Sequence, residues 1–309
     1  MIKVLERAPG LDLIKGKTLV EIGGKPLLKV PEDERRQAFD IAAEVVADSV
    51  KRHYVPPIKL GPHEEATVKL SSETTFHGEF DEFAELHSLS GPPDSDTACV
   101  KRIRSRVSNA IKSQADIFFV PPKGITIVSD IDAVLRVSQY MPRLKESAFK
   151  PYRPWLNMPQ IFAKFKTRCD IHFHYITNAP SPFTDMYMRF LVHFYPPGSF
   201  DAARTNVRFP SEVNLNLILE KFPNRKFYLL LDMTKRYRFT TMAPSRLECI
   251  LIRDIAPLNY REKFKIANLK ENWKFIPKTK IRYFTKPDDL MGLDFDAGGC
   301  GIPKLQKYN

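Results

Sequence analysis

The stretch that decides the fold is GITIVSDIDAVL, residues 124–135. It opens with a short, continuously apolar run, which predicts a strand buried on both faces of a sheet. Asp130 and Asp132 come at the end of this run. The strand is therefore expected to lead into a loop that carries two carboxylates, and we predict that this loop begins a phosphate-handling site.

Three later runs have the same pattern, a short apolar stretch that ends in a polar residue. They are IHFHYIT (171–177), KFYLLLD (226–232) and CILIRD (249–254). Helical patterns separate them: WLNMPQIFAKFKTR, FTDMYMRFLVHF and SEVNLNLILEKF. Buried strands with helices between them predict an α/β domain with a parallel sheet of βαβ units. Ligands bind outside the carboxyl ends of such strands, so the polar residues there are expected to converge. These residues are Asp130, Thr177, Asp232 and Asp254.

The pair of carboxylates suits phosphoryl transfer. Asp130 can attack phosphorus and form an aspartyl-phosphate, and Asp132 can protonate the leaving oxygen and later activate water. Because two negative charges repel a phosphate, a cation is needed, and Mg²⁺ binds one or two carboxylates together with waters and phosphate oxygens. A DxD sequence after an apolar strand also fits a loop cap or a solvated turn. The two carboxylates alone leave these interpretations open.

The other strand ends favour the site. Thr177 and Asn178 offer a hydroxyl and backbone N–H groups that can hold phosphate oxygens. Asp232 offers a carboxylate that can complete a Mg²⁺ shell. A helix-capping role for Thr177 and a solvated loop position for Asp232 stay open as alternatives.

Residues 1–120 have a different pattern. PEDERRQAFDIAAEVVADSVKRHY, residues 31–54, opens with Pro31 and acidic residues and ends in basic residues, which predicts a helix. Runs at 17–22, 65–72, 74–86 and 116–120 predict a small, mainly antiparallel sheet. We therefore expect a β-rich accessory domain with one helix, ending before the pair Pro121-Pro122.

Composition limits the class of protein. The chain is 43% hydrophobic and 27% charged, as globular proteins are, and no apolar run is long enough to span a bilayer. The N-terminal sequence has no secretory core, so we expect a cytoplasmic location with peripheral attachment to membranes, and a mitochondrial location stays open. The four cysteines are far apart, so reduced thiols are expected. The formal charge of +12 points to an anionic partner without specifying it.

Five longer stretches are specific enough to compare with a known family: FFVPPKGITIVSDIDAVL, FHYITNAPSPFTDMYMRFL, FYPPGSFDAAR, ILEKFPNRKFYLLLD and LIRDI. Together they resemble the catalytic domain of the actin-patch-protein family of phosphatidate phosphatases, a haloacid-dehalogenase-like group. The resemblance implies a Rossmann-like sheet of haloacid-dehalogenase type and hydrolysis of phosphatidate to diacylglycerol and phosphate. It also implies Asp130 as nucleophile and Asp132 as general acid and base. Thr177 is implied as the phosphate-binding hydroxyl and Asp232 as a Mg²⁺ ligand.

Several positions depart from the family's pattern. The family reads DIDDT where this chain has Ala133 and Val134 after the DxD, and its phosphate-clamping lysine falls at Ser211. Its GDSG block reads LDMTKRY here, which keeps Asp232 and places Tyr237 at the second acid. Loss of a cation that neutralises transition-state charge costs on the order of a hundredfold or more in rate. An inactive family member that serves as a lipid-binding or scaffold protein is therefore the alternative to an enzyme.

We predict three parts: an accessory domain at 1–120, a haloacid-dehalogenase-like phosphatase domain at 121–285 and a glycine-containing tail at 286–309. The predicted activity is Mg²⁺-dependent hydrolysis of phosphatidate, with Asp130, Asp132 and Asp232 as the metal ligands and the anionic phospholipid met at a membrane surface. Nucleic-acid binding lacks a supporting motif. The neighbouring His172 and His174 are expected to be structural rather than metal ligands.

Overall fold

The structure is a computed structural model that describes residues 99–106, 114–137, 152–179, 184–202, 215–232, 246–254 and 276–301, together with short strands nearer the N-terminus. The chain forms two compact units. The first contains Met1–Thr97, Lys101–Phe119 and Ser138–Pro151, and the second contains Ala98–Val100, Val120–Val137 and Tyr152–Asn309. In the part of the chain that the structure describes, no helix is long and apolar enough to cross a membrane.

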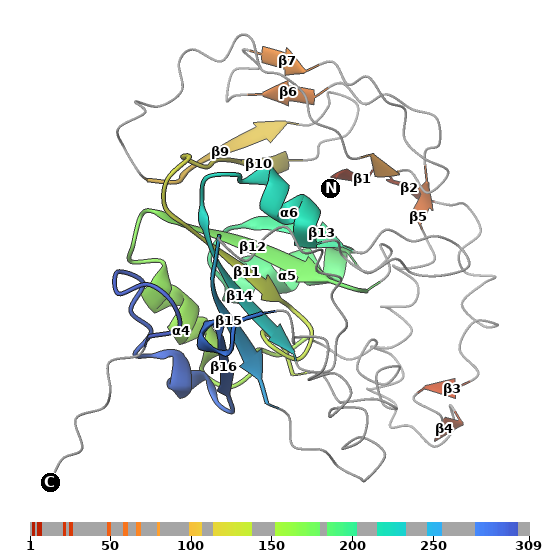
Figure 1. Ribbon diagram of the computed structural model, residues 1–309. Helices are drawn as coiled ribbons and strands as arrows, with labels where there is room; N and C mark the ends of the chain where they lie inside the picture. The colour runs from red at the N-terminus through yellow and green to blue at the C-terminus, as the bar shows by residue number, and fades with distance from the viewer. Residues whose placement is uncertain are drawn as a thin grey trace, which may run out of the picture. The chain divides into compact units, whose positions relative to one another are not determined.

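The second unit is built on a six-stranded sheet in which all neighbouring strands run parallel. Across the sheet the strands are β13 (Ser199–Ala202), β12 (Ile171–Thr177), β11 (Ile125–Asp130), β14 (Lys226–Asp232), β15 (Leu247–Arg253) and β16 (Ile281–Phe284) (Figure 1). The predicted α/β class is therefore confirmed. The four predicted strands fill the centre, and the sequence pattern does not predict the two edge strands.

The strand order reverses at β11. β12 and then β13 extend the sheet on one side of β11, whereas β14, β15 and β16 extend it on the other. In open α/β sheets the ligand crevice lies outside the carboxyl ends of the strands at such a reversal. The carboxyl ends of β11 and β14 are therefore where this fold favours a binding site.

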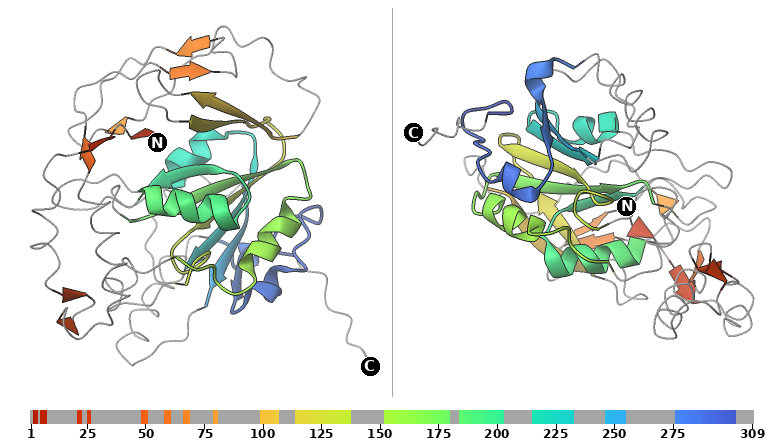
Figure 2. Two further views of the ribbon diagram at one scale, coloured as in Figure 1. Left: turned by 180° about the vertical axis from the view of Figure 1, so that it is seen from behind. Right: turned by 90° about the horizontal axis from the view of Figure 1, so that it is seen from below.

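Helices cover both faces of the sheet. α4 (Met158–Phe165) and α5 (Thr184–Phe194) lie on one face and α6 (Leu215–Lys221) on the other (Figures 1 and 2). Phe162 of α4 packs on β12, with its ring centroid 5.5 Å from that of Phe173 and 6.3 Å from that of Tyr175. The opposite face forms a core from α6 and alternate strand residues. Its members include Leu215, Ile218, Leu219, Val128, Ile176, Phe227 and Leu229.

At the amino end of the sheet, the buried side chain of Arg225 donates hydrogen bonds to residues at and before the starts of β11 and β12. Arg225 is only 2% exposed, and burial lowers its pKa to about 10 against the opposing charge of Asp170. It donates to the Thr126 hydroxyl and to the carbonyls of Pro121, Lys123, Ile125 and Asp170. Gly124 lies against this guanidinium with φ +117°, and a Cβ there would come within 2.8 Å of Arg225 Nη1. Only glycine suits that position.

The two histidines of β12 bind the edge strand β13. His172 Nε2 lies 2.8 Å from Ser199 Oγ, and His174 Nε2 lies 3.1 Å from Asp201 Oδ2. Lys221 of α6 also donates to Asp201, at 3.0 Å. These contacts give both histidines a structural part in holding the edge of the sheet.

All four cysteines of the chain are paired. Cys99 is bonded to Cys169 and Cys249 to Cys300, with Cα–Cα distances of 4.6 and 5.0 Å. The prediction of reduced thiols was wrong because it rested on spacing in the sequence. The partners are 70 and 51 residues apart, and the returns of the chain between parallel strands bring them together.

The C-terminal segment packs on the second unit. The short helices η4 (Lys278–Lys280) and η5 (Pro287–Leu290) flank and follow β16. Asn157, just before α4, donates to Asp288 at 2.7 Å, and Lys164 donates to the carbonyl of Met291 at 2.7 Å. Residues 286–301 of the predicted tail are therefore attached to α4.

The described strands of the first unit form antiparallel pairs. The pairs are β1 (Ile2–Lys3) with β8 (Glu79–Phe80), β2 (Leu5–Arg7) with β5 (Asp48–Val50), β3 (Glu21–Ile22) with β4 (Lys25–Pro26), β6 (Ile58–Leu60) with β7 (Ala66–Val68), and β9 (Lys101–Arg106) with β10 (Gln114–Phe119).

One prediction for this unit fails at β5. Residues 48–50 were expected to be helical but pair with β2, since aspartate, serine and valine are weak helix formers that a strand partner can outweigh. The rest of the predicted helix at 31–54 lies outside the described residues. The predicted accessory domain and its limits stay predictions.

Candidate active site

The loop after β11 begins with the two predicted carboxylates. Asp130 is the last residue of the central strand and is fully buried, and Asp132 is 7% exposed. The backbone N–H of Asp132 donates to Asp130 Oδ1 at 3.2 Å, and that of Ile131 donates to the carbonyl of Ile176 in β12 at 2.9 Å. These bonds fix the loop on the end of the sheet. Ala133 follows in the left-handed region, with φ 62°.

Three protein groups donate hydrogen bonds to the side chain of Asp132. Arg136 Nε lies 2.8 Å from Oδ1, the Tyr187 hydroxyl 2.6 Å from Oδ1, and the Thr177 hydroxyl 2.6 Å from Oδ2. Because an opposite charge and hydrogen bonds to the charged form stabilise that form, this environment favours ionised Asp132.

Arg136 is enclosed by aromatic rings. Its guanidinium carbon lies 4.0 Å from the ring centroid of Tyr152 and 5.3 Å from that of Tyr187. Burial opposes the charge of Arg136, but Tyr187 and Asp132 outweigh it and raise the pKa of the guanidinium. Burial, and then the charge of Asp132, raises the pKa of Tyr187 well above its ordinary value. The arginine thus stays charged and the phenol stays a donor.

The predicted phosphate-binding residues lie beside Asp132. Thr177 ends β12, is 1% exposed and accepts a hydrogen bond from the backbone N–H of Ala179 at 3.1 Å. Its hydroxyl proton is directed at Asp132. The bond from Ala179 lies in the loop before α5, which begins at Thr184. Thr177 therefore shapes this loop rather than capping the helix, and half-buried Asn178 follows it directly.

The remaining predicted site residue, Asp232, lies beside an arginine. Asp232 ends β14, is 2% exposed and is the register partner of Arg253 in β15. The Arg253 guanidinium donates to the carbonyl of Ala133 and lies 3.5 Å from the ring centroid of Trp155. Burial lowers the pKa of Arg253 to about 10, and the charge of Asp232 opposes that shift. Arg253 therefore joins the end of β15 to the loop of Asp130.

The predicted metal ligands lie at the carboxyl ends of two adjacent strands. Among the described residues, no group of three or more histidine, cysteine, aspartate or glutamate side chains is placed to hold a metal ion. Mg²⁺ needs only one or two carboxylates besides water and phosphate oxygens. Asp130 and Asp232 end the paired strands β11 and β14 and offer two buried carboxylates, which is the number that Mg²⁺ needs. Both oxygens of the Asp132 side chain accept protein hydrogen bonds.

The arginines and tyrosines of the site were not predicted from the sequence. Arg136 follows Asp132 by four residues, and that spacing was the available signal for it. Tyr187 lies 55 residues beyond Asp132, and its contact depends on how α5 packs. The altered positions Ser211 and Tyr237 lie outside the described residues.

Comparison with known families gives a match to the central part of the chain. Residues 125–254 match the model of the family described as phosphatidate phosphatase APP1, catalytic domain. The match begins at the first residue of β11 and ends one residue after β15. It confirms the resemblance over this stretch, which contains Asp130, Asp132, Thr177 and Asp232. A search of curated proteins finds no match to the chain.

Proposed function

We propose that the second unit is a hydrolase that cleaves phosphatidate, or a related phosphomonoester, to the free alcohol and phosphate, with a fold of haloacid-dehalogenase type. The position of Asp130 carries the proposal. It ends the central strand beside the reversal of strand order and lies in the stretch that matches the phosphatidate phosphatase family. In open α/β sheets a ligand binds just outside the carboxyl ends of the strands, which is where the buried Asp130 side chain lies.

In the first step the Asp130 carboxylate attacks phosphorus, and the bond from phosphorus to the substrate oxygen breaks. Asp132, in its protonated form, gives a proton to that leaving oxygen. The products of this step are the free alcohol, an aspartyl-phosphate on Asp130 and ionised Asp132. While Asp132 is protonated, the Thr177 hydroxyl can donate its one proton to a phosphate oxygen instead of to Asp132, and Asn178 offers further donors at the same strand end.

In the second step ionised Asp132 takes a proton from water, and the oxygen of that water attacks the aspartyl-phosphate. Phosphate leaves, and Asp130 returns as a carboxylate. The hydrogen bonds from Arg136, Tyr187 and Thr177 favour ionised Asp132, so the observed arrangement suits this step. Asp130 and Asp232 are the residues that would hold Mg²⁺, which would supply positive charge against the phosphate oxygens.

The test is phosphate release from phosphatidate in detergent micelles, with Mg²⁺ and with a chelator. Asp130→Asn keeps the shape of the side chain and removes the nucleophile, so kcat is expected to fall roughly a thousandfold or more. Asp116→Asn is the matched control, because Asp116 is an exposed carboxylate of β10 paired with Arg102 at 2.7 Å. Asp130→Asn with the activity of the control would exclude the aspartyl-phosphate mechanism.

The environment of Asp132 also favours a second function, a non-catalytic lipid-binding protein. An acid held in its charged form by an arginine and two hydroxyls cannot protonate a leaving group until it takes up a proton. This alternative predicts binding to phosphatidate vesicles without turnover. The binding would be unchanged by a chelator and by Asp132→Ala, whereas turnover in the assay above would exclude it.

A further inference from the structure

The two disulfides use every cysteine of the chain. The sequence has four cysteines, and the structure leaves none free. Four cysteines allow three pairings. The fold brings together the partners of one of them, Cys99 with Cys169 and Cys249 with Cys300. The bonds join residues 70 and 51 positions apart, so neither follows from closeness in the sequence.

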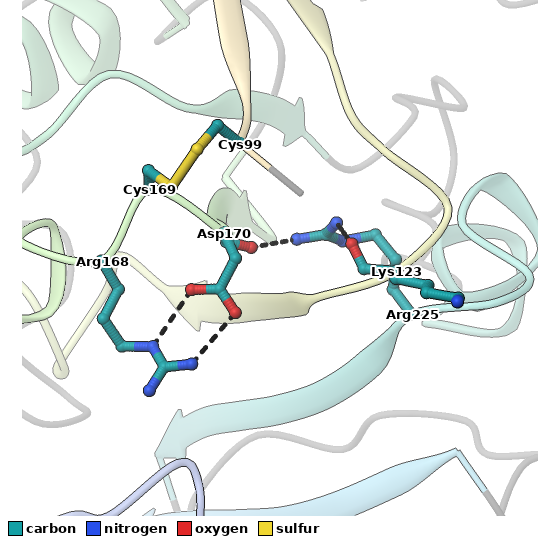
Figure 3. Close-up of a disulfide and its surroundings, with 6 residues drawn as sticks. All are labelled: Cys99, Lys123, Arg168, Cys169, Asp170 and Arg225. Atoms are coloured by element: carbon teal, nitrogen blue, oxygen red, sulfur yellow. Dashed lines mark hydrogen bonds and ion pairs between the residues drawn. A yellow bond between two sulfur atoms is a disulfide. The ribbon is translucent and has the colours of Figure 1, made fainter. Parts of the chain in front are cut away.

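The first disulfide lies beside Arg225 and the backbone carbonyl of Asp170, which accepts a hydrogen bond from it (Figure 3). Cys169 is in the turn that leads into β12, and its carbonyl accepts a hydrogen bond from the backbone N–H of Val100 at 2.8 Å. In the same turn Arg168 donates to both carboxylate oxygens of Asp170, at 3.0 and 3.1 Å, and Arg225 donates to the Asp170 carbonyl. The bond therefore attaches residues 99 and 100 of the second unit to the turn that the Arg168–Asp170 pair and Arg225 hold.

The second disulfide joins a core strand to the C-terminal segment. Cys249 is fully buried in β15, and Cys300 follows Gly298 and Gly299, which have φ 68° and 63°. The backbone N–H of Gly299 donates to Glu248 Oε2 at 3.0 Å. These left-handed residues turn the chain back toward β15, which gives a physical reason for the glycines around Cys300.

We infer that this chain acquires both disulfides while it matures in an oxidising compartment, and that its site meets its ligand there. Each bond forms when two thiols lose two protons and two electrons to a disulfide of a thiol oxidoreductase, which becomes a dithiol. Such paired cysteines persist in secreted, luminal or periplasmic proteins and are rare in the cytosol, where thiols are kept reduced. This location differs from the cytoplasmic one expected from the N-terminal sequence, and the inference is independent of the proposed function.

The pairing is tested on the full chain produced through a secretory pathway. The protein is alkylated while denatured, without reduction, and digested with trypsin. Each cysteine then lies in its own peptide, and these peptides span 70–101, 169–189, 247–253 and 283–304. The inference expects two linked pairs, 70–101 with 169–189 and 247–253 with 283–304. Four alkylated cysteines, or any other pairing, would overturn it.

The compartment is tested by producing the same full chain in a reducing cytosol. Without its disulfides the chain is expected to have free thiols, a lower unfolding temperature and faster cleavage by a protease than the secreted protein. Cytosolic protein re-oxidised with a glutathione buffer is the matched control and should regain both properties. Reduced protein as stable and as protease-resistant as the secreted form would contradict the need for an oxidising compartment.

Discussion

The Tyr187 hydroxyl donates a 2.6 Å hydrogen bond to Asp132 inside the second unit, where both residues are buried. Hydrogen bonds to charged groups contribute about 1.5–3 kcal/mol, so Tyr187→Phe is expected to lower the free energy of unfolding by about 2 kcal/mol. Urea unfolding near neutral pH measures this change.

Tyr195→Phe is the matched control for that prediction. Tyr195 is also buried, but its hydroxyl donates to a neutral acceptor, the carbonyl of Leu135 at 2.5 Å. Loss of a bond to a neutral group costs about 1 kcal/mol. If Tyr187→Phe costs no more than Tyr195→Phe, Asp132 is not held as a charged acceptor.

Leu156 carries backbone strain at an exposed position. It has φ 50° and is 66% exposed, so its side chain is largely in water while its backbone occupies a region that costs non-glycine residues about 1–2 kcal/mol. Asparagine tolerates this conformation better. We expect Leu156→Asn to raise the free energy of unfolding by about 0.5–1 kcal/mol, as measured by urea unfolding.

Val192→Asn is the control that distinguishes relief of backbone strain from replacement of an exposed apolar side chain by a polar one. Val192 is 74% exposed in α5 and has helical backbone. Because asparagine and valine have similar helix propensities, this change should leave stability within about 0.5 kcal/mol. An equal gain at both positions would attribute the effect to loss of an exposed apolar side chain.

At the residue scale, the sequence pattern predicts the positions of the acidic residues of the site but not the side chains that bind them. Asp130 and Thr177 end buried runs, and the period of the strands is sufficient to predict where they lie. Tyr187 meets Asp132 across 55 residues of sequence because the fold packs α5 beside the loop after β11, and no local pattern encodes that packing. The disulfides escaped prediction for the same reason.

The pairing of β12 with β13 makes the sheet edge sensitive to pH. Burial first, and then the charges of His174 and Arg225, lowers the pKa of His172 well below its ordinary value. The unfolded chain takes up a proton at this histidine near pH 6.5 while the folded chain does not. Stability is therefore expected to fall as pH drops below about 6.5, by up to about 1.4 kcal/mol per pH unit.

His172→Gln should remove this slope, because glutamine can still bind Ser199 but does not titrate. Urea unfolding at pH 7 and pH 5.5 measures it, and His193→Gln, at an exposed position of α5, is the control. Asp201 does not contribute in this window. Burial opposes its ionisation, but the bond and charge of His174 hold its pKa below the usual range, so its contribution is lost only below about pH 4. An unchanged slope in His172→Gln would contradict the prediction.

At the element scale, the strands buried on both faces were predictable and the edge strands were not. β11 and β12 are buried along their whole length, and β14 is buried at every residue after its first, because helices cover both faces of the sheet. β13 and β16 have four residues each, with half-buried or exposed positions. Such short mixed segments have no distinctive periodicity, so hydrogen bonding to a preformed neighbour determines them.

At the scale of the whole molecule, the disulfides add stability by restricting the unfolded chain. Loop-closure entropy gives about 4 kcal/mol for each bond at separations of 70 and 51 residues. Cys249→Ser is expected to cost about 1–2 kcal/mol more than Cys99→Ser, since it also leaves a hydroxyl in the core. Cys249 is fully buried, whereas Cys99 is half-buried.

Urea unfolding of the two variants and of the oxidised parent measures these costs. The parent unfolded with and without a reducing agent gives the joint effect of both bonds. A parent that is equally stable in both conditions would show that the bonds do not restrict the unfolded chain.

The hydrogen bonds of Arg225 limit which substitutions related sequences can carry at the amino end of the sheet. Its acceptors at Pro121 and Lys123 are main-chain carbonyls, which every amino acid provides. The identities at those positions can change without loss of an acceptor, whereas no other side chain offers the five donors of arginine. In a library of single substitutions, Arg225 and Gly124 would tolerate no change, whereas Pro121 and Lys123 would, and related sequences would differ around an arginine whose importance no local motif reveals.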